Sequence, residues 1–179
     1  MVADRLERGC VQLFTGHGKG KTTAALGLAM RAAGSGLRTH FIQFMKGQHY
    51  GELDAAKMLG GLVTIEQHGS AEFCVTEGED AKEHYLHARS AVARSREALT
   101  YSSIDILVLD EIVTALLFKL VTLDEILEIV KAKPAGMELV LTGRGAPQEL
   151  VDACDLVTEM REVKHYYTAG VDGRKGIEY

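Results

Sequence analysis

Short apolar runs alternate along this chain with longer segments whose apolar residues recur at helical spacing. The runs with the length of β-strands occupy residues 10–15, 37–45, 61–67, 104–111, 137–144 and 156–160. The segments with helical character occupy residues 22–36, 79–99, 112–119, 123–131 and 146–154. The run "IDILVLDE" has a continuous apolar stretch that ends in two carboxylates, which is typical of a strand covered on both faces. Strands that alternate with helices predict an α/β fold, with three layers around a mostly parallel central sheet.

Two stretches of the chain have a weaker pattern. Residues 46–53, "KGQHYGEL", predict a loop after the second strand. Residues 162–179 contain the turn "VDGRKG", and we expect this tail to pair as edge strands. The long helix over residues 79–99 has a rough apolar stripe that we expect to face the core. This stripe consists of Ala81, Tyr85, Ala88, Val92 and Leu99.

The composition is that of an ordinary globular protein and narrows the classes of function. The 179 residues suggest one domain, 1–179, in which 46% of residues are hydrophobic and 25% are charged. No apolar run approaches the ~20 residues that cross a bilayer, and the start "MVADRLERGC" lacks the apolar region of a signal peptide. We therefore expect a cytoplasmic protein without a membrane partner. A net charge of −5 without a long basic run argues against nucleic-acid partners. The three widely spaced cysteines, Cys10, Cys74 and Cys154, favour free thiols over disulfides or a Cys-x-x-Cys zinc site.

The stretch "TGHGKGKT", Thr15–Thr22, carries the strongest chemical signal in the chain. It fits the phosphate-loop pattern, which ends in Gly-Lys-Ser/Thr, except that Thr15 takes the place of the first glycine. A predicted strand runs into it and a predicted helix runs out of it. Glycines allow backbone N–H groups to curl around a phosphate, and the helix N-terminus adds partial positive charge. The alternative, a glycine-rich turn with two solvated lysines, fits this context less well.

Two side chains of this loop have predicted roles in holding a nucleotide. Lys21 places a full charge on the outer phosphates, and the Thr22 hydroxyl is expected to ligate Mg²⁺ or Mn²⁺. We expect Lys21 to lie on a solvent-facing loop, so that the fold does not depend on it.

A phosphate loop that holds Mg²⁺ usually draws a carboxylate from the end of a second strand. The run "ILVLDE" ends in Asp110 and Glu111. Adjacent residues on a strand point to opposite sides, so only one of the two faces the metal unless the strand ends between them. The alternative is an acidic helix N-terminus that the helix dipole stabilises. Together the two motifs predict binding of a magnesium–nucleoside triphosphate, while motor, kinase, switch and transferase chemistry stay open.

The sequence as a whole resembles the ATP-dependent cob(I)alamin (corrinoid) adenosyltransferases of the small phosphate-loop type. The matching stretches occur in the family's order and cover most of the chain. They are "FTGHGKGKTTAALG", "RAAGSG", "IQFMKG", "LVLDEI", "LTGRGAPQELVDACDLVTEM" and "VKHYYTAGVDGRKGIEY". Threonine at the first place of the loop is the form that this family uses, and "TGRGAP" with the closing "GIEY" is more specific than a phosphate loop alone. The resemblance implies a three-layer P-loop NTPase fold of the RecA-like kind.

The resemblance also implies an unusual use of ATP. In this family a Co(I) corrinoid attacks the 5′-carbon of ATP, forms a carbon–cobalt bond and expels the whole triphosphate. The loop then holds a leaving group, and Lys21, Mg²⁺ and backbone N–H groups stabilise the charge that builds on it. Similar enzymes bind ATP in a reversed sense, which points the 5′-carbon away from the loop and toward the corrin.

The family's site residues can be carried over by position. Thr22 and Glu111 would hold Mg²⁺, with Asp110 as the other candidate carboxylate. Arg31 would lie near the nucleoside, and Arg144, at the C-terminal end of a strand, would reach the nucleotide and join Lys21 as a catalytic residue. A solvated helix arginine and a surface ion pair are the simpler interpretations of these two arginines. The predicted ATP-binding residues are Gly16, His17, Gly18, Lys19, Gly20, Lys21, Thr22, Thr23, Arg31 and Arg144.

The predicted corrinoid side is where the chain departs from the family, whose corrin-facing loop carries a Phe and a nearby Trp that displace the lower axial ligand. This chain has no tryptophan. Phe73, in "QHGSAEFCVTEGED", is the candidate for that Phe, either alone or with an apolar residue such as Val75, unless the corrinoid is handled differently. An ordinary core aromatic is the alternative. His49 and Tyr50 are candidates to line the corrin pocket, with plain surface loop residues as the alternative.

The remaining expectations concern metals and partners. His84 and His87 have the i, i+3 spacing of metal ligands, but without a third ligand nearby a core or solvated helix face explains them. The resemblance implies a corrinoid substrate, an electron-donor reductase protein and a homodimer. A phosphate-loop regulatory or assembly ATPase, which hydrolyses ATP to ADP and phosphate, is the competing function.

Overall fold

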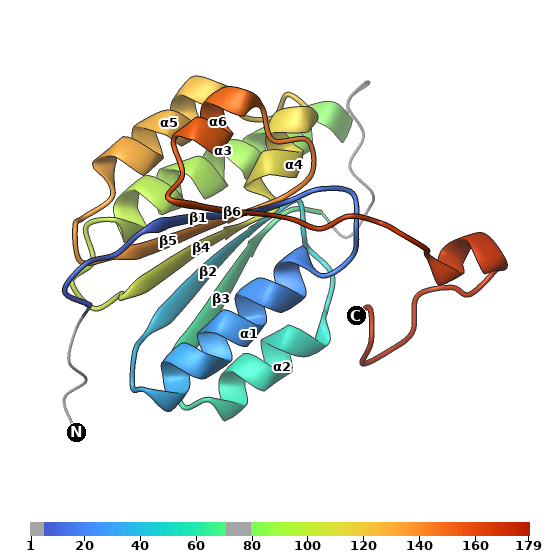
Figure 1. Ribbon diagram of the computed structural model, residues 1–179, viewed down its shortest axis with the longest axis horizontal. Helices are drawn as coiled ribbons and strands as arrows, with labels where there is room; N and C mark the ends of the chain where they lie inside the picture. Colours follow the sequence, from blue (N-terminus) through green and yellow to red (C-terminus); the bar gives the residue numbers. More distant parts are fainter. Residues whose placement is uncertain (1–5, 71–79) are drawn as a thin grey trace.

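The computed structural model describes residues 6–70 and 80–179, whose helices and strands form three layers (Figure 1). The middle layer is a six-stranded sheet in the order β3-β2-β4-β5-β1-β6, and every neighbouring pair of strands is parallel. The predicted α/β fold with a parallel central sheet is therefore confirmed. The strands are β1 (Val11–Thr15), β2 (Thr39–Phe44), β3 (Val63–His68), β4 (Ile106–Asp110), β5 (Glu138–Thr142) and β6 (Leu156–Glu159).

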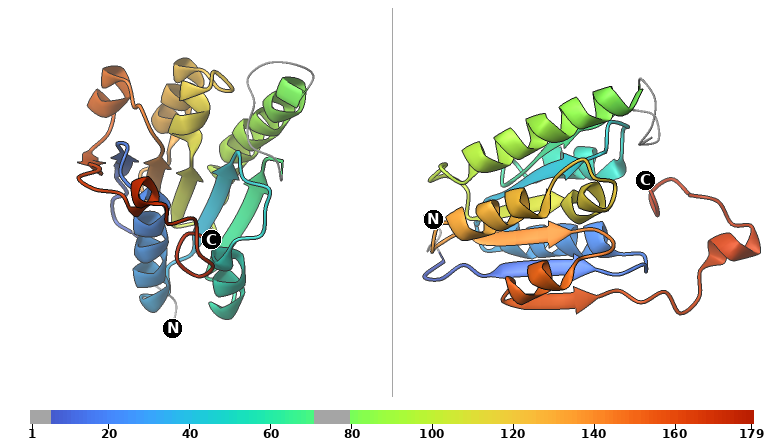
Figure 2. Two further views of the ribbon diagram at one scale, coloured as in Figure 1. Left: turned by 90° about the vertical axis from the view of Figure 1, so that its right-hand side faces the viewer. Right: turned by 90° about the horizontal axis from the view of Figure 1, so that it is seen from above.

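Helices cover both faces of the sheet. Helices α1 and α2 lie on one face, and α3 to α6 lie on the other (Figures 1 and 2). The alanine-rich face of α1 allows close approach to the sheet, and Ala25 and Ala29 are almost fully buried there. The helices are α1 (Lys21–Gly34), α2 (Gly51–Met58), α3 (Asp80–Ala98), α4 (Ile112–Leu117), α5 (Leu123–Ala132) and α6 (Gln148–Asp152), followed by a 3₁₀ turn at Tyr166–Ala169.

Burial follows the position of each strand in the sheet. All residues of β2 and β4, in the middle of the order, are buried, because helices cover both faces of these strands. All residues of β6 are exposed, and this strand pairs only with β1, at one edge of the sheet. No helix in the described part of the chain is long and apolar enough to cross a membrane.

Three details of the sequence-based prediction are wrong. Residues 46–53 are not all loop, because α2 begins at Gly51. The tail after β6 forms no strand within the described residues, and its ordered part is the 3₁₀ turn at Tyr166–Ala169. Tyr85, expected in the core, is 49% exposed and lies under the guanidinium of Arg89, at 4.9 Å.

The tail leaves the sheet because its polar groups find partners within the tail itself. The Tyr166 hydroxyl and the Arg174 guanidinium both donate hydrogen bonds to Glu178. These bonds lower the pKa of the Glu178 carboxyl to about 2. The tail projects beyond the carboxyl ends of the strands (Figure 2). It then returns toward the β1–α1 loop, where the Lys19 ammonium contacts the carbonyl of Ile177 at 3.5 Å.

The loop between β1 and α1 packs closely against the end of β6. The Gly18 N–H donates a hydrogen bond of 2.6 Å to the carbonyl of Met160. A Cβ atom at Gly16 or Gly18 would lie 2.5 Å or 2.7 Å from that carbonyl oxygen. Gly16 and Gly20 also have positive φ values of 94° and 116°, which favour glycine. The glycines are therefore needed for the shape of the loop.

We expect Gly18→Ala to destabilise the protein by about 1–3 kcal/mol, because its new methyl group meets a backbone carbonyl that has little room to move. The matched control is Gly27→Ala in α1, where a Cβ would meet nothing within 4 Å. Since glycine is a poor helix former, this control should stabilise the protein by about 0.5–1 kcal/mol. Urea unfolding midpoints of the two variants measure both effects. Equal midpoints would contradict the packing argument.

Candidate functional site

The β1–α1 loop encloses the ammonium group of Lys21. This side chain is only 6% exposed, and Nζ donates hydrogen bonds to the carbonyl oxygens of Gly16, at 2.9 Å, and Gly18, at 2.8 Å. The expected solvent-facing position of Lys21 is therefore wrong. Burial lowers the pKa of Lys21, and the neighbouring charge of Glu111 opposes this effect. A cation held by two carbonyl oxygens can exchange those acceptors for phosphate oxygens without leaving the loop.

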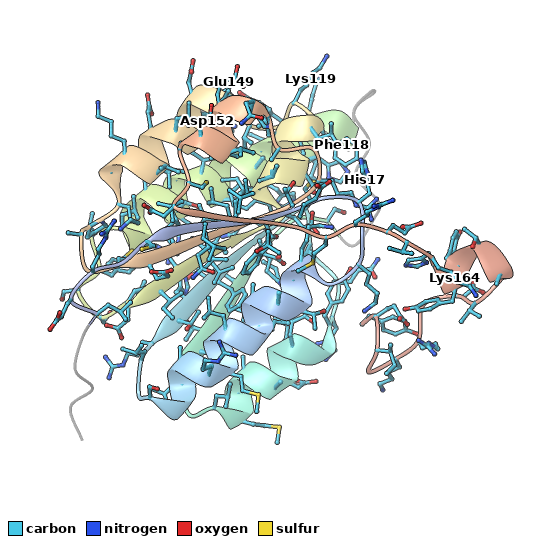
Figure 3. All side chains as sticks on the ribbon, in the orientation of Figure 1. His17, Phe118, Lys119, Glu149, Asp152 and Lys164 are labelled. Atoms are coloured by element: carbon cyan, nitrogen blue, oxygen red, sulfur yellow. The ribbon has the colours of Figure 1, made fainter. Side chains whose placement is uncertain are left out.

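The other loop residues face outward or begin the helix. His17 and Lys19 are exposed, and Figure 3 labels His17 at the carboxyl end of the sheet. Gly20 is the N-cap of α1 and offers no side-chain cap, so no side chain satisfies the first N–H groups of the helix. Thr22 and Thr23 lie in that first turn. The backbone is thus arranged as in a helix N-terminus that binds an anion.

Asp110, the last residue of β4, connects this helix start to the sheet. Its side chain has no exposed surface. One carboxylate oxygen accepts hydrogen bonds from the hydroxyls of Thr22, at 2.8 Å, and Thr142, at 2.7 Å. The other accepts bonds from the Gln43 amide, at 3.1 Å, and the Lys46 ammonium, at 2.9 Å. The sequence prediction named Thr22 and Asp110 and missed the other three residues, although polar residues at the ends of buried strands were a signal for them.

Glu111 lies just beyond the strand end and has a different environment. Its φ is 63°, and it is the N-cap of α4, so β4 ends between the two carboxylates. Its carboxylate accepts a hydrogen bond from the Thr114 hydroxyl, and its backbone N–H donates to Thr142 Oγ1 at 2.9 Å. Glu111 is partly exposed, whereas Asp110 is fully enclosed. The carboxylate of Glu111 is therefore the more accessible of the two.

The oxygen donors at this site suit a magnesium ion that also binds a nucleotide. Hydroxyl and carboxylate oxygens are the ligands that Mg²⁺ prefers, and one or two carboxylates with phosphate oxygens and water complete its shell. The described residues contain no group of three or more His, Cys, Asp or Glu side chains that would hold a metal alone. His84 and His87 accordingly belong to no such group, and His87 pairs with Glu83 at 3.3 Å. The Thr22 hydroxyl and the Glu111 carboxylate are oxygen donors of this kind, and their role as ligands stays a prediction.

The two predicted arginines lie in different places. Arg144 follows β5 and is exposed, and its positive charge contributes to the lowered pKa of Lys21. Its backbone N–H donates to Thr114 Oγ1 at 3.0 Å. Arg144 and the loop both lie at the carboxyl ends of the strands. Arg31 lies in the last turn of α1 and is also exposed. Ten residues of helix separate it from Lys21, about 15 Å along the axis, so the structure does not bring Arg31 to the loop.

The residues predicted to face the corrinoid are partly described. His49 is exposed, and its Nε2 lies within hydrogen-bond distance of Asp54 Oδ2, at 2.8 Å. Tyr50 is the N-cap of α2, and the Lys46 ammonium lies 5.2 Å from its ring centre. Lys46 thus touches both this segment and Asp110. Phe73 lies outside the described residues.

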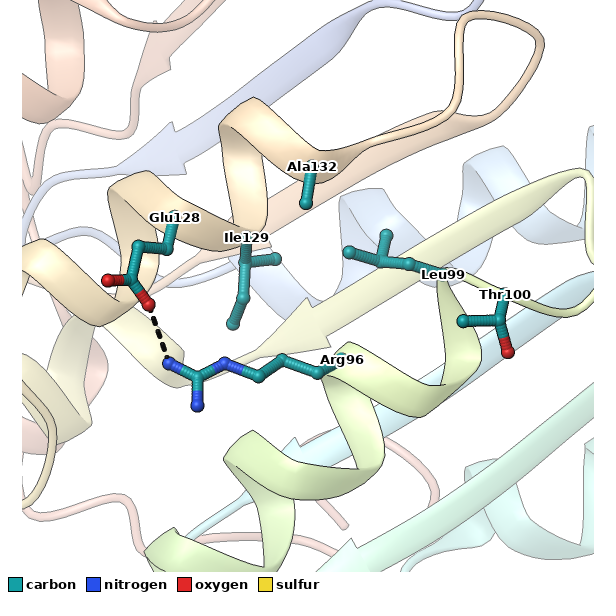
Figure 4. Close-up of a pocket in the computed structure, with 6 residues that line it drawn as sticks. All are labelled: Arg96, Leu99, Thr100, Glu128, Ile129 and Ala132. Carbon is teal, nitrogen blue, oxygen red and sulfur yellow. Dashed lines mark hydrogen bonds and ion pairs between the residues drawn. The ribbon is translucent and has the colours of Figure 1, made fainter.

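A cavity of about 380 Å³ lies elsewhere, between the last turns of α3 and α5 (Figure 4). Both helices are followed by a strand, α3 by β4 and α5 by β5. This cavity therefore lies at the amino ends of the strands, whereas the glycine loop lies at their carboxyl ends. The Arg96–Glu128 ion pair of 2.8 Å spans it, and the other lining residues are Leu99, Thr100, Ile129 and Ala132. It is therefore separate from the candidate site.

Solved structures similar to this chain show its fold. The flagellar accessory protein FlaH from Methanocaldococcus jannaschii superimposes with a TM-score of 0.56 at 10% identity, over 86% of this chain and 72% of FlaH. The RadB recombinase gives a TM-score of 0.56 at 13% identity, over 89% of this chain and 78% of RadB. At such low identity these similarities establish a RecA-like phosphate-loop fold and no activity.

The sequence comparisons are more specific. Residues 7–179 match the family described as ATP:corrinoid adenosyltransferase BtuR/CobO/CobP. The corrinoid adenosyltransferase of Escherichia coli (strain K12) is 33% identical over 179 residues, covering 97% of this chain and 87% of the relative. The corrinoid adenosyltransferase CobA of Salmonella typhimurium is 34% identical with the same coverage, 97% and 87%. The Pseudomonas aeruginosa enzyme is 35% identical, covering 98% of this chain and 86% of its own. With a family match over nearly its whole length and a phosphate loop in the matching fold, the chain belongs to the ATP:corrinoid adenosyltransferase family.

Proposed function

We propose that this chain transfers the 5′-deoxyadenosyl group of ATP to a Co(I) corrinoid and releases triphosphate. As a member of its family, the chain is a transferase that moves an adenosyl group from ATP to a corrinoid. The observation that carries the proposal is the hydrogen bond that connects the phosphate loop to the end of β4. Lys21 lies inside the loop, and Thr22, the next residue, is bonded to the buried Asp110.

The reaction needs stabilisation of a leaving group rather than activation of water. An electron pair on Co(I) forms the bond to the 5′-carbon, and the bond from that carbon to the triphosphate oxygen breaks, with its electrons leaving on the triphosphate. In this proposal Lys21 and the N–H groups at the start of α1, which no N-cap side chain satisfies, bind that charge. A Mg²⁺ ion, held by Thr22 and Glu111 when bound, would add a Lewis acid on the phosphate oxygens. Arg144, exposed at the same edge, is the further candidate to contact the nucleotide.

The finer features of the proposal concern partners and location. A Co(I) corrinoid requires a reductant, so we propose an electron-donor protein that docks near the corrinoid. We also propose a homodimer, which the family resemblance implies, and a cytoplasmic location, where ATP is available. His49 and Tyr50, next to Lys46, and Phe73 remain our candidates for the corrinoid side.

The phosphate product distinguishes this function from that of a regulatory ATPase. We expect incubation with ATP and a chemically reduced corrinoid to give triphosphate and an adenosylated corrinoid in equal amounts. ADP and orthophosphate, formed without the corrinoid, would instead support the ATPase.

Lys21→Ala should reduce adenosyl transfer by roughly 100-fold or more, because it removes a preorganised charge from the leaving group. The variant should still fold, with a stability loss of about 1–3 kcal/mol, because the two lost hydrogen bonds to carbonyls are partly offset by relief of the cost of burying the ammonium. Transfer rates and thermal unfolding measure the two effects. Lys131→Ala, an exposed lysine in the last turn of α5, is the control and should match the wild type. Unaltered transfer by Lys21→Ala would remove the phosphate-loop assignment.

Glu111→Gln and Asp110→Asn should separate metal binding from folding. Glu111→Gln should raise the Mg²⁺ concentration for half-maximal transfer by roughly tenfold or more and leave the nucleotide-free stability nearly unchanged. Asp110→Asn should lower stability by roughly 3 kcal/mol, because it leaves the charge of Lys46 without its closest partner. Magnesium titrations and urea unfolding test both variants. If only a well-folded Asp110→Asn shows the metal defect, the two carboxylates have the opposite roles.

Phe73→Ala should slow transfer that starts from a Co(II) corrinoid and a weak reductant. An apolar side chain under the corrin disfavours a polar lower ligand, which would lose water without gaining a hydrogen bond. Loss of that ligand makes cobalt easier to reduce, and this chain has no tryptophan to share the task. The same variant should lose much less activity when Co(I) is supplied already reduced. Equal losses in both assays would make Phe73 structural, and no loss in either would place the corrin elsewhere.

A further inference from the structure

Lys46 has an unusual position for a lysine, because its charged end is turned into the protein. It follows β2 in the stretch "IQFMKG", directly after Met45, whose φ is 60°. The Lys46 side chain is only 16% exposed. Its Nζ lies 2.9 Å from Asp110 Oδ2 and 3.6 Å from Glu52 Oε1. Burial lowers the pKa of Lys46, but the charge and hydrogen bond of Asp110 outweigh burial and hold it above its usual value.

The ammonium group lies between two carboxylates, those of Asp110 and Glu52. The Glu52 side chain is 13% exposed, and the Asp110 side chain is 0% exposed. The Gln43 amide donates to both, at 3.2 Å to Glu52 Oε1 and at 3.1 Å to Asp110 Oδ2. Two carboxylate oxygens that point at one cation form an arrangement that a divalent ion also favours. Lys46 therefore occupies a position that would otherwise attract a metal.

This occupation determines what Asp110 can do. One of its oxygens is used by the Thr22 and Thr142 hydroxyls, and the other by Gln43 and Lys46. A carboxylate oxygen with two donors has little capacity left for a direct bond to a metal. The Glu111 carboxylate is partly exposed and accepts a hydrogen bond from the Thr114 hydroxyl. It therefore has more capacity than Asp110 to bind a metal.

We propose that Lys46 is a positioning residue that serves as the counter-ion of Asp110. It holds the Asp110 carboxylate in its hydrogen bond with the Thr22 hydroxyl. It also prevents divalent cations from binding between Asp110 and Glu52. A metal then binds only with the nucleotide, on the Thr22–Glu111 side of the loop. The inference rests on the proposed function for the identity of that nucleotide. The competing role for Lys46 is a direct contact with the triphosphate.

The test measures Mn²⁺ binding to the nucleotide-free protein by electron paramagnetic resonance, which requires neither ATP nor corrinoid. The wild type and Lys46→Arg should bind Mn²⁺ weakly, because each retains a cation between the carboxylates. Lys46→Met should bind Mn²⁺ at least about tenfold more tightly, since two carboxylates then share an unoccupied position. Lys46→Met with Glu52→Gln should lose that gain. Lys57→Met, which changes an exposed lysine of α2 paired with Asp54, is the control and should behave as the wild type.

Binding of tripolyphosphate without metal tests the competing role. In Lys46→Met the two uncompensated carboxylates should weaken this binding by about tenfold through repulsion. The double variant with Glu52→Gln restores the net charge of the three-residue group, from −2 in Lys46→Met to the wild-type value of −1, and should return to near wild-type affinity. A double variant that stays as weak as Lys46→Met would mean that Lys46 binds the phosphate itself and would overturn the proposal.

If Lys46→Met does not fold, Lys46→Gln provides the second variant, because its amide can still donate to Asp110 without carrying charge. A folded Lys46→Met or Lys46→Gln without any gain in Mn²⁺ affinity also overturns the proposal. These outcomes are independent of adenosyl transfer. Failure of the proposed function would instead appear in the phosphate product of the wild-type enzyme.

Discussion

The buried carboxylate of Asp110 is the interaction on which the site depends. A charge without exposed surface is costly to bury unless it is paired and fully hydrogen-bonded, and this one is both. Its four partners come from different places: Thr22 from the start of α1, Thr142 from the end of β5, Gln43 from β2 and Lys46 from the loop after β2. Because β2, β4 and β5 are neighbours in the sheet, one side chain joins three strand ends to the phosphate loop. The position of Thr22 is therefore a property of the sheet as much as of the loop.

A second constraint acts on the opposite side of the loop. Gly18 is bonded to Met160 at the end of β6, and the space there excludes even a methyl group. The loop is thus held at one end by a buried charge and at the other by backbone packing. Lys21 lies between these two anchors, with carbonyl oxygens in place of phosphate. Such a loop needs little reorganisation to bind an anion, which is the condition for strong electrostatic stabilisation.

The sequence predicted the parts of the molecule that depend on local pattern. The run that became β4 was recognisable because both faces of the strand are covered, so four of its five residues, ILVLD, are apolar. The start of α2 was not recognisable, because Tyr50 precedes it without a side-chain cap and Gly51 is its first residue. The tail was misread as edge strands because its stabilising contacts, between Tyr166, Arg174 and Glu178, are specific to side chains and invisible to a periodicity argument.

The site shows the same division between local pattern and three-dimensional context. The glycines, Lys21, Thr22 and the two carboxylates follow from motif and spacing. That β4 ends between Asp110 and Glu111 was left open by the sequence, since strand ends are set by the chain that follows, here the left-handed turn at Glu111. Lys46 lies in the family-like stretch "IQFMKG", but the sequence predicts no role for it, because a lysine after a strand is usually solvated. Only the structure reveals its partners, because it brings Asp110 from a distant part of the chain and Glu52 from the first turn of α2 to the same ammonium group.

The fold that this chain shares with FlaH and RadB, at 10% and 13% identity, does not by itself determine the chemistry. In this chain the distinguishing features lie around the loop. The segment from Lys46 to Tyr50 begins at the carboxylate that positions Thr22 and leads into α2. If the corrinoid binds there, as we propose, the same short segment touches both substrates. The Lys46–Asp110 ion pair would then influence both how the loop binds the leaving triphosphate and where the attacking corrinoid lies. A transfer to the 5′-carbon requires that the two substrates be held in one relative orientation, because its nucleophile and its leaving group lie on opposite sides of one carbon atom.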